Sequence, residues 1–231
     1  MAPGGWIEIY GSNLAPHARQ WAGTDFSGAN APTTLDGVQV KIGGQSAFVD
    51  FINPGQINAQ LPSNIPAGGM LGVTVTNGSQ TSSAFNVKVN NTEPGLLAPP
   101  SFIVGGKQYV VALLPDGVTF VVPDGAIAGI PARPARSNEI ITMYGVGFGT
   151  VTPPIAGGQI AGVATQLSAT FQILFGQTSA QVPYAGLAPG FVGLYQFIVV
   201  VPPVPDNNLV PLTFNLGGVP GTQTLFIAVH Q

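Results

Sequence analysis

The chain has 231 residues, enough for one large domain or for two of about 100 residues each. Hydrophobic residues make up 45% and charged residues only 6%, which predicts a folded chain with a neutral polar surface and argues against disorder. A formal charge of -3 without any basic cluster argues against nucleic-acid binding, and the absence of cysteine excludes disulfides, thiolate metal sites and cysteine nucleophiles.

Short runs rich in Val, Ile, Thr and Phe follow one another along the whole chain. The 32 glycines and 22 prolines between them leave no room for helices of ordinary length. Short strands at regular spacing, separated by turn residues, are typical of an all-β sandwich or barrel. In chain order the predicted strands are residues 6–10, 38–42, 47–52, 71–76, 84–89, 109–114, 118–122, 139–144, 170–175, 195–201, 209–216 and 224–229.

Two Asx-Gly pairs between these runs predict hairpins, because such pairs tolerate the positive φ angles of tight turns. They are Asn77-Gly78 and Asp116-Gly117, the second beside Pro115, which indicates an edge position. The longest apolar run, Phe197 to Val204, is too short to span a bilayer and contains prolines, so no membrane insertion is expected. The first residues show no signal peptide, and the abrupt start of a strand at Trp6 indicates a fragment of a longer chain.

An internal repeat is the most informative feature. "IEIYGSNLAP" from Ile7 resembles "ITMYGVGFGT" from Ile141, a shift of 134 residues. Ser46 corresponds to Ser179 with a shift of 133, and Pro54 to Pro189 with a shift of 135. Near-constant shifts indicate two copies of one sandwich unit. We predict domains at residues 1–92 and 101–231 with a linker at 93–100, the first domain lacking its first strand and the second carrying an N-terminal extension.

The repeated pattern resembles a known family. The order of "YG", "VQVKIGGQSAFVDF", "PGQINAQLP" and "LGVTVTNG" is similar to the IPT/TIG branch of immunoglobulin-like domains. The second copy, above all "GLAPGFVGLYQ" at residues 186–196, resembles the uncharacterised Solibacter-type C-terminal domain of large exported bacterial proteins. The resemblance implies two tandem immunoglobulin-like β-sandwiches in a secreted or cell-surface module, with no catalytic residues to transfer.

Three glycines at alternate positions, Gly145, Gly147 and Gly149, raise the question of a phosphate-binding loop. The spacing is not that of a dinucleotide fingerprint, and the following Thr152-Pro153-Pro154 cannot begin the required helix. We interpret these glycines as a strand end and turn that need positive φ.

The polar residues offer no catalytic or metal-binding pattern. His17 and His230 are far apart in the sequence, and no nucleophile-elbow motif occurs. The acids at Asp116, Asp124 and Asp206 lack the spacing of a calcium loop and are typical of turns. We therefore predict no enzyme activity, no cofactor and no metal.

Two loop aromatics are the candidate ligand-binding residues. Trp21 and Phe26 lie outside any strand pattern, and sugar-binding platforms use such rings at a surface. The alternative is that they cap the sandwich core. Tyr195 alternates with apolar residues and is predicted to pack inside.

The resulting prediction is a non-catalytic structural or adhesive C-terminal module of a larger extracellular or cell-surface protein. Its partners would be neighbouring domains of the longer chain and a protein or glycan at the cell surface. Few charges on its strands also permit weak self-association. The alternative function is a carbohydrate-binding module that uses Trp21 and Phe26, with or without calcium held by loop acids.

Overall fold

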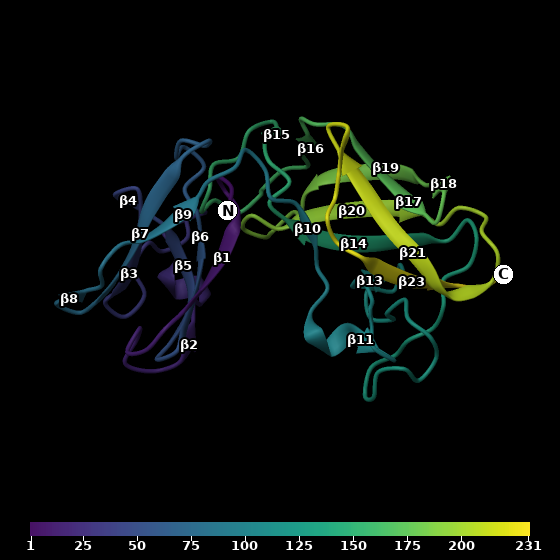
Figure 1. The fold of residues 1–231 in the computed structure, drawn as a ribbon, viewed down its shortest axis with the longest axis horizontal. Helices are drawn as coiled ribbons and strands as arrows, with labels where there is room; N and C mark the ends of the chain where they lie inside the picture. The colour runs from purple at the N-terminus through teal and green to yellow at the C-terminus, as the bar shows by residue number, and fades with distance from the viewer. The chain divides into compact units, whose positions relative to one another are not determined.

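The computed structural model describes residues 1–231 and contains β-strands with two short 3-10 segments, which confirms the predicted all-β class (Figure 1). It has no helix whose length and apolar character would allow it to cross a bilayer. The chain forms two compact units. Unit 1 consists of residues 1–93, 147–164 and 188–193, and unit 2 consists of residues 94–146, 165–187 and 194–231.

Unit 1 is built from two antiparallel sheets. One has the strand order β1-β6-β5-β2, and the other the order β4-β3-β7-β8, with β9 also paired to β7. The strands are β1 (Trp6–Tyr10), β2 (Arg19–Gln20), β3 (Val38–Ile42), β4 (Gln45–Ser46), β5 (Phe48–Asn53), β6 (Gln56–Gln60), β7 (Met70–Asn77), β8 (Gln80–Thr81), β9 (Phe85–Lys88) and the short β15 (Val151–Thr152); η1 is Gly23–Asp25.

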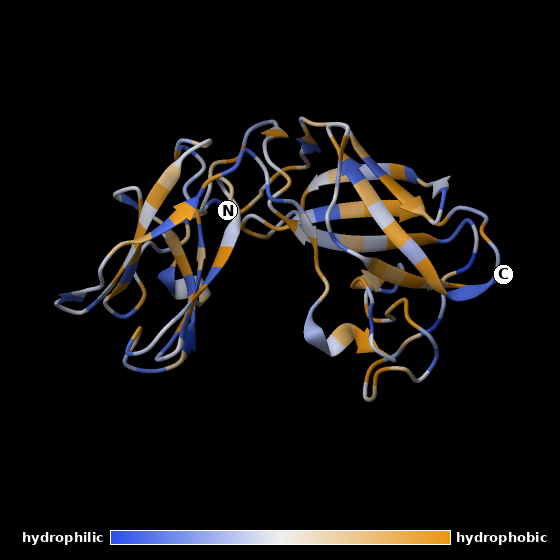
Figure 2. Cartoon of the chain, in the orientation of Figure 1, coloured by the Kyte–Doolittle hydropathy of each residue, from blue (hydrophilic) through white to orange (hydrophobic).

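The core of unit 1 follows from alternating side chains. In β3, Val38, Val40 and Ile42 are fully buried, and in the central strand β6 the buried residues are Ile57 and Ala59. Because successive side chains of a strand point to opposite faces, one face of each sheet supplies the apolar layer and the other is polar. The alternation is visible as orange and blue bands along the strands in Figure 2.

Unit 2 has the same two-sheet plan with additions. One sheet has the order β10-β14-β20-β19, with β13 also paired to β14, and the other the order β18-β17-β21-β22, with β23 also paired to β21. The elements are β10 (Gly95–Leu96), η2 (Pro100–Phe102), β11 (Ile103–Val104), β12 (Lys107–Gln108), β13 (Ala112–Leu113), β14 (Ile140–Val146), β16 (Gln166–Leu167), β17 (Phe171–Phe175), β18 (Thr178–Ser179), β19 (Gln181–Leu187), β20 (Tyr195–Val200), β21 (Asn207–Leu216), β22 (Val219–Pro220) and β23 (Leu225–Val229).

Unit 2 also has a small second cluster beside its main core. Phe102, Tyr109 and Val122 are buried there against Ala228 of β23. Phe102 and Phe120 meet edge to face, with ring centroids 5.3 Å apart. Residues 102–132, which are rich in Pro and Gly, are therefore held by side-chain packing, with only the β11–β12 hairpin and the short β13 as regular structure.

The two units repeat one strand plan. The corresponding pairs are β1 and β14, β6 and β20, β5 and β19, β3 and β17, β7 and β21, and β9 and β23. The hydrogen bonds repeat as well. Met1 N donates to Lys88 O (3.1 Å) and Met1 O accepts from Asn90 N (2.8 Å). Ala135, 134 residues later, makes the same two bonds with residues 228–230 at 3.0 and 2.9 Å.

The repeat extends to backbone conformation and to an irregularity in one strand pair. Gly4 and Asn138, also 134 residues apart, both have φ of 68°. A β-bulge interrupts the β5–β6 ladder at Asp50. The β19–β20 ladder has its own one-residue shift between Gln181 and Tyr184. Shared bulges at corresponding positions are designed features of a fold, so the two sandwiches are copies in detail.

The compact units differ from the predicted domain ranges in two respects. Part of the expected linker, Gly95–Leu96, is β10 and pairs with β14 in unit 2. Residues 147–164 and 188–193, which come from the second half of the sequence, belong to unit 1. There Gly158 N donates to Gln60 Oε1 (2.6 Å) and Ala31 N donates to Gly158 O (2.7 Å).

Most predicted strands are present, and the exceptions have physical reasons. The central strand β6 was not predicted because Gln56, Asn58 and Gln60 on its outer face have low strand propensity. The predicted strand at residues 118–122 forms only isolated bridges, within the Pro- and Gly-rich stretch of unit 2. Both predicted hairpins are confirmed: Gly78, with φ of 59°, lies in the turn between β7 and β8, and Leu114 N donates to Thr119 O across Asp116-Gly117.

Candidate functional site

The loop that carries Trp21 and Phe26 connects β1 to β3 in unit 1. Its short strand β2 pairs with β5, with Arg19 opposite Ile52 and Gln20 opposite Phe51. The pairing continues one residue further, where Trp21 N donates to Asp50 O at 2.7 Å. The backbone of β5 thus fixes the position of Trp21 at the edge of the sheet.

Trp21 lies between two other aromatic rings. Its centroid is 5.8 Å from that of Trp6 at an interplanar angle of 71°, and 5.0 Å from that of Phe26 at 66°. Both contacts are edge-to-face, which is a favourable arrangement for aromatic quadrupoles. All three residues are half-buried, and Trp21 also packs against the core of unit 1. Ligand binding by Trp21 and Phe26 stays a prediction, and the contacts show that Trp21 has a packing role.

Sequence reasoning missed the third ring, Trp6. Its signal was the alternation of β1, in which Ile7 and Ile9 contact the core and Trp6, Glu8 and Tyr10 have the opposite orientation. No local pattern indicated that this outward Trp6 would meet Trp21, which is fifteen positions later in the chain.

An ionic network holds the same loop together. Arg19 donates to both oxygens of Asp25 at 2.9 Å each, and to both oxygens of Asp36 from Nε at 2.7 Å and Nη2 at 3.0 Å. A further weak bond from Nη1 reaches Gln20 O at 3.4 Å. Guanidinium has five N–H donors in a fixed fork, and all five have acceptors here. Arg19 therefore ties the loop together and has no donor left for an anionic ligand.

The carboxylates of this network are acidic. Hydrogen bonds from the Arg19 guanidinium, then from Ala22 N at 2.7 Å, lower the pKa of Asp25 from 3.8 to about 2. The pKa of Asp36 is lowered by Arg19 first and by His17 second, whose Nε2 lies 2.9 Å from Asp36 Oδ2. Since these side chains are partly exposed to solvent, screening reduces the energy of each pair, and the network acts mainly on loop geometry.

Asp50 contacts this loop but is not part of the network. It occupies the β-bulge of β5, and Gln20 Nε2 donates to its Oδ1 at 3.2 Å. Partial burial raises the pKa of Asp50, and the hydrogen bond from Gln20 opposes that rise. A carboxylate and an amide are groups that hydrogen-bond sugar hydroxyls, and the backbone of Asp50 positions Trp21, so Asp50 and Gln20 extend the candidate site.

The polar groups of Gln60 and of the segment around Gly158 have hydrogen-bond partners. Gln60 is one of two buried polar side chains; its Nε2 donates to Gly4 O (2.9 Å) and its Oε1 accepts from Gly158 N. Gly157 N donates to Ser63 Oγ at 3.0 Å. The segment around Gly158 therefore covers the part of unit 1 that contains Gln60 and Ser63.

The other candidate residues have structural partners. Gly147 and Gly149 follow β14 with φ of 77° and 92°, which confirms the interpretation for these two glycines. For Gly145 the interpretation was wrong, because this residue lies inside β14, opposite Leu96 and Tyr195, and does not have a positive φ. Asp116 accepts from Val118 N and from Thr119 N and Oγ1 within its turn. No group of three or more His, Asp or Glu side chains is placed to hold a metal ion. Tyr195 is buried, as predicted.

Comparisons with known proteins address unit 1 most directly. A search of curated proteins found no match. Residues 3–90 match the family model described as the IPT/TIG domain. The matched residues include both sheets of unit 1, from β1 to β9. The sandwich formed by residues 3–90 is thereby supported as an immunoglobulin-like domain of the IPT/TIG family.

Proposed function

We propose that this chain is a non-catalytic structural or adhesive module of a larger secreted or cell-surface bacterial protein, related to the Solibacter-type C-terminal domain. The IPT/TIG match carries the proposal, since such domains are generally non-enzymatic immunoglobulin-like modules. The ionic groups of unit 1 support it, because Arg19 and its two carboxylates are used within one loop. The expected partners are neighbouring domains and a protein or glycan at the cell surface.

The location is tested on the native protein. Antibodies raised against residues 1–231 are expected to label intact bacteria or to detect the protein in culture supernatant. Labelling that appears only after cell lysis, with an intracellular marker, would refute the surface location. The non-catalytic role is tested by a panel of hydrolase substrates, for which we expect no turnover above that of a heat-unfolded control.

The cluster of Trp6, Trp21 and Phe26 beside the Gln20–Asp50 pair favours carbohydrate binding as a second function. Half-exposed rings next to a carboxylate and an amide offer both stacking and hydrogen bonding to a sugar. A glycan array should then show binding that Phe26→Ala weakens and that Phe85→Ala, an exposed ring on β9, does not. Calcium and chelator arms test the role of loop acids. Uniform absence of binding would leave only the structural function.

A further inference from the structure

One edge of unit 1 has unpaired backbone groups. In the β1–β6 ladder, Gly11 N donates to Gly55 O (3.1 Å) and Leu61 N donates to Gly5 O (2.8 Å). In an antiparallel pair, residues whose backbone groups bond to the partner strand alternate with residues whose backbone groups point away from it. The backbone N–H and C=O groups of the odd-numbered residues of β1 therefore point towards β6. The amide and carbonyl groups of Trp6, Glu8 and Tyr10 therefore point away from β6, and β1 is the last strand of its sheet.

The corresponding edge of unit 2 is paired. With the repeat shift of 134, Glu8 corresponds to Thr142 and Tyr10 to Tyr144. Thr142 is opposite Leu113 of β13, and Tyr144 O accepts from Leu97 N at 2.8 Å. The segment that contains β13 also contacts β23, the last strand of the other sheet. There, Val110 N donates to Phe226 O at 3.1 Å. Residues 109–114 thus close unit 2 between β14 and β23.

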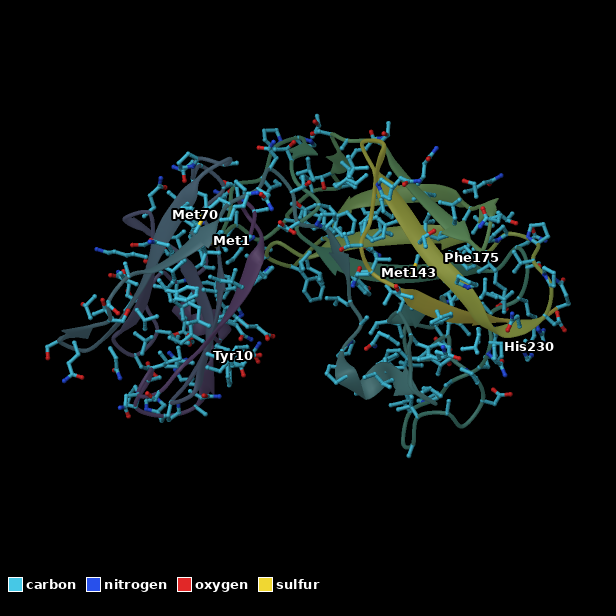
Figure 3. All side chains as sticks on the ribbon, in the orientation of Figure 1. Met1, Tyr10, Met70, Met143, Phe175 and His230 are labelled. Carbon is cyan, nitrogen blue, oxygen red and sulfur yellow. The ribbon has the colours of Figure 1, made fainter.

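Side chains beside the unpaired edge of unit 1 are more exposed than their counterparts in unit 2. Phe85 of β9 is 73% exposed, whereas its counterpart Leu225 of β23, 140 residues later, is 3% exposed. Ile9 of β1 is half-buried, whereas its counterpart Met143, labelled in Figure 3, is fully buried. We call the surface formed by the β1 edge, the β9 edge, Ile7, Ile9, Phe85 and Val87 the open side of unit 1. It combines free edge groups with uncovered core side chains, and Figure 1 shows β1 and β9 as separate strands of the two sheets.

We propose that the open side of unit 1 binds an extended peptide strand, antiparallel to β1, with small or branched apolar residues at alternate positions. Unit 2 defines this chemistry, because the strand on its equivalent side buries Val110, Ala112 and Leu114 and has no charged residue between 109 and 114. The added strand would pair with Glu8 and cover Phe85. Strand addition of this kind obtains affinity from main-chain hydrogen bonds and specificity from alternate side chains.

The inference is independent of the surface location and of sugar binding. It uses the backbone edge of β1 and the side chains of β9, whereas the sugar-binding proposal uses the ring of Trp6 together with Trp21 and Phe26 of the loop. The partner is a strand of stated chemistry, and a second copy of this chain is the alternative that the experiment must separate.

The test uses the full 231-residue chain and a synthetic peptide with the sequence of residues 108–116, carrying added lysines for solubility. Amide hydrogen exchange is followed by NMR at increasing peptide concentration. Glu8 is expected to exchange at least about tenfold more slowly when peptide is bound, while Ile7, already bonded to β6, changes little. Tryptophan emission should shift with the same saturation curve, because both tryptophans are in unit 1.

A peptide N-methylated at the Leu113 position is the decisive control, because it lacks one edge donor and leaves the protein unaltered. It should bind at least about tenfold more weakly. Phe85→Asp should weaken binding of the unmodified peptide, while Val163→Ser, at an exposed apolar residue elsewhere in unit 1, should not. Unchanged Glu8 exchange at high peptide concentration, or equal binding of the N-methylated peptide, overturns the proposal. Protection of Glu8 that rises with protein concentration alone would identify a second copy as the occupant and overturn the choice made here.

Discussion

The two sandwiches of this protein have the same strand order, corresponding bulges and equivalent hydrogen bonds. They differ on the side that lies between β1 and β9 in unit 1 and between β14 and β23 in unit 2. In unit 2, residues 109–114 cover that side, and Leu225 and Met143 are buried. In unit 1 the corresponding Phe85 is exposed and Ile9 is half-buried. The difference shows that burial of the equivalent side chains depends on the segment that covers this side, while a continuous core joins the two sheets of unit 1.

The units also differ in one connection. Copy 1 joins β5 to β6 by the short turn at Pro54-Gly55, whereas copy 2 joins β19 to β20 through residues 188–194. The shift between copies consequently rises from 133 at Ser46 and Ser179 to 140 at Leu61 and Val201. The added residues are the ones that belong mostly to unit 1, where Ala161 N donates to Phe191 O at 2.9 Å.

The largest expected effect is the difference in stability loss between substitutions in the last strands of the two units, β23 and β9. Leu225→Ala should destabilise unit 2 by about 2–5 kcal/mol, since it leaves a cavity in a closed core. Phe85→Ala should change unit 1 by less than about 0.5 kcal/mol, because most of its ring is already in water. Urea unfolding checks both, with tryptophan emission reporting unit 1 and hydrogen exchange reporting unit 2. A cost above about 1.5 kcal/mol for Phe85→Ala would mean that the ring is covered in solution.

The next comparison uses equivalent turn residues. Asn13 and Gly147 are 134 residues apart and both have positive φ, at 56° and 77°. A Cβ at Gly147 would lie 2.0 Å from Glu93 O, a backbone atom that cannot move aside. Gly147→Asn should therefore cost about 1–3 kcal/mol, whereas Asn13→Gly should be nearly neutral. Thermal unfolding checks both variants: Gly147→Asn should melt at a lower temperature than Asn13→Gly, and equal melting temperatures would show that Gly147 is no more crowded than Asn13.

A smaller effect is expected from acid, and it is specific to the loop of unit 1. The folded-state pKa of Asp25 is lowered from 3.8 to about 2, so its stabilisation is present above about pH 4 and is lost as the pH falls towards 2. Tryptophan emission should change over this window as the loop around Trp21 loosens. Arg19→Gln should abolish the transition or move it towards pH 4. An unaltered acid profile in Arg19→Gln would contradict the assigned role of the network.

Unit 2 provides the reference for that experiment. Arg133 donates to both oxygens of Glu139 at 2.9 and 2.8 Å, and this pair lowers the pKa of Glu139. Arg133→Gln should leave the tryptophan transition of unit 1 as it is, because neither tryptophan lies in unit 2.

The smallest effect is expected where the copies agree. Gly4 and Asn138 have the same φ of 68°, and the nearest atom to a Cβ at Gly4 is Ser63 Cβ at 3.9 Å. Gly4→Asn should therefore change the stability of unit 1 by less than about 0.5 kcal/mol, since asparagine tolerates this conformation and the space is open. A loss above about 1 kcal/mol in urea unfolding would show that the two turns are not interchangeable.

Local sequence signals predicted the strands with clear alternation, and they failed where burial rather than propensity decides. β1 and β3 have the predicted limits, Trp6–Tyr10 and Val38–Ile42. β6 is central although it is rich in Gln and Asn, because Ile57 and Ala59 alone supply its buried face. The candidate site was predicted only in part, since the loop ring Trp21 was identified and its partner Trp6 was not.

What the sequence by itself determined is the all-β class, the repeat and the turns, because these depend on period, on Gly and Asn conformations, and on the similarity of two stretches of one chain. What only the tertiary structure decided is which strand edges are paired and which side chains meet. The exposure of Phe85 and the burial of Leu225 depend on a segment from elsewhere in the chain, residues 109–114, that reaches one copy and not the other. Contacts between distant residues are set by packing, and no local pattern encodes them.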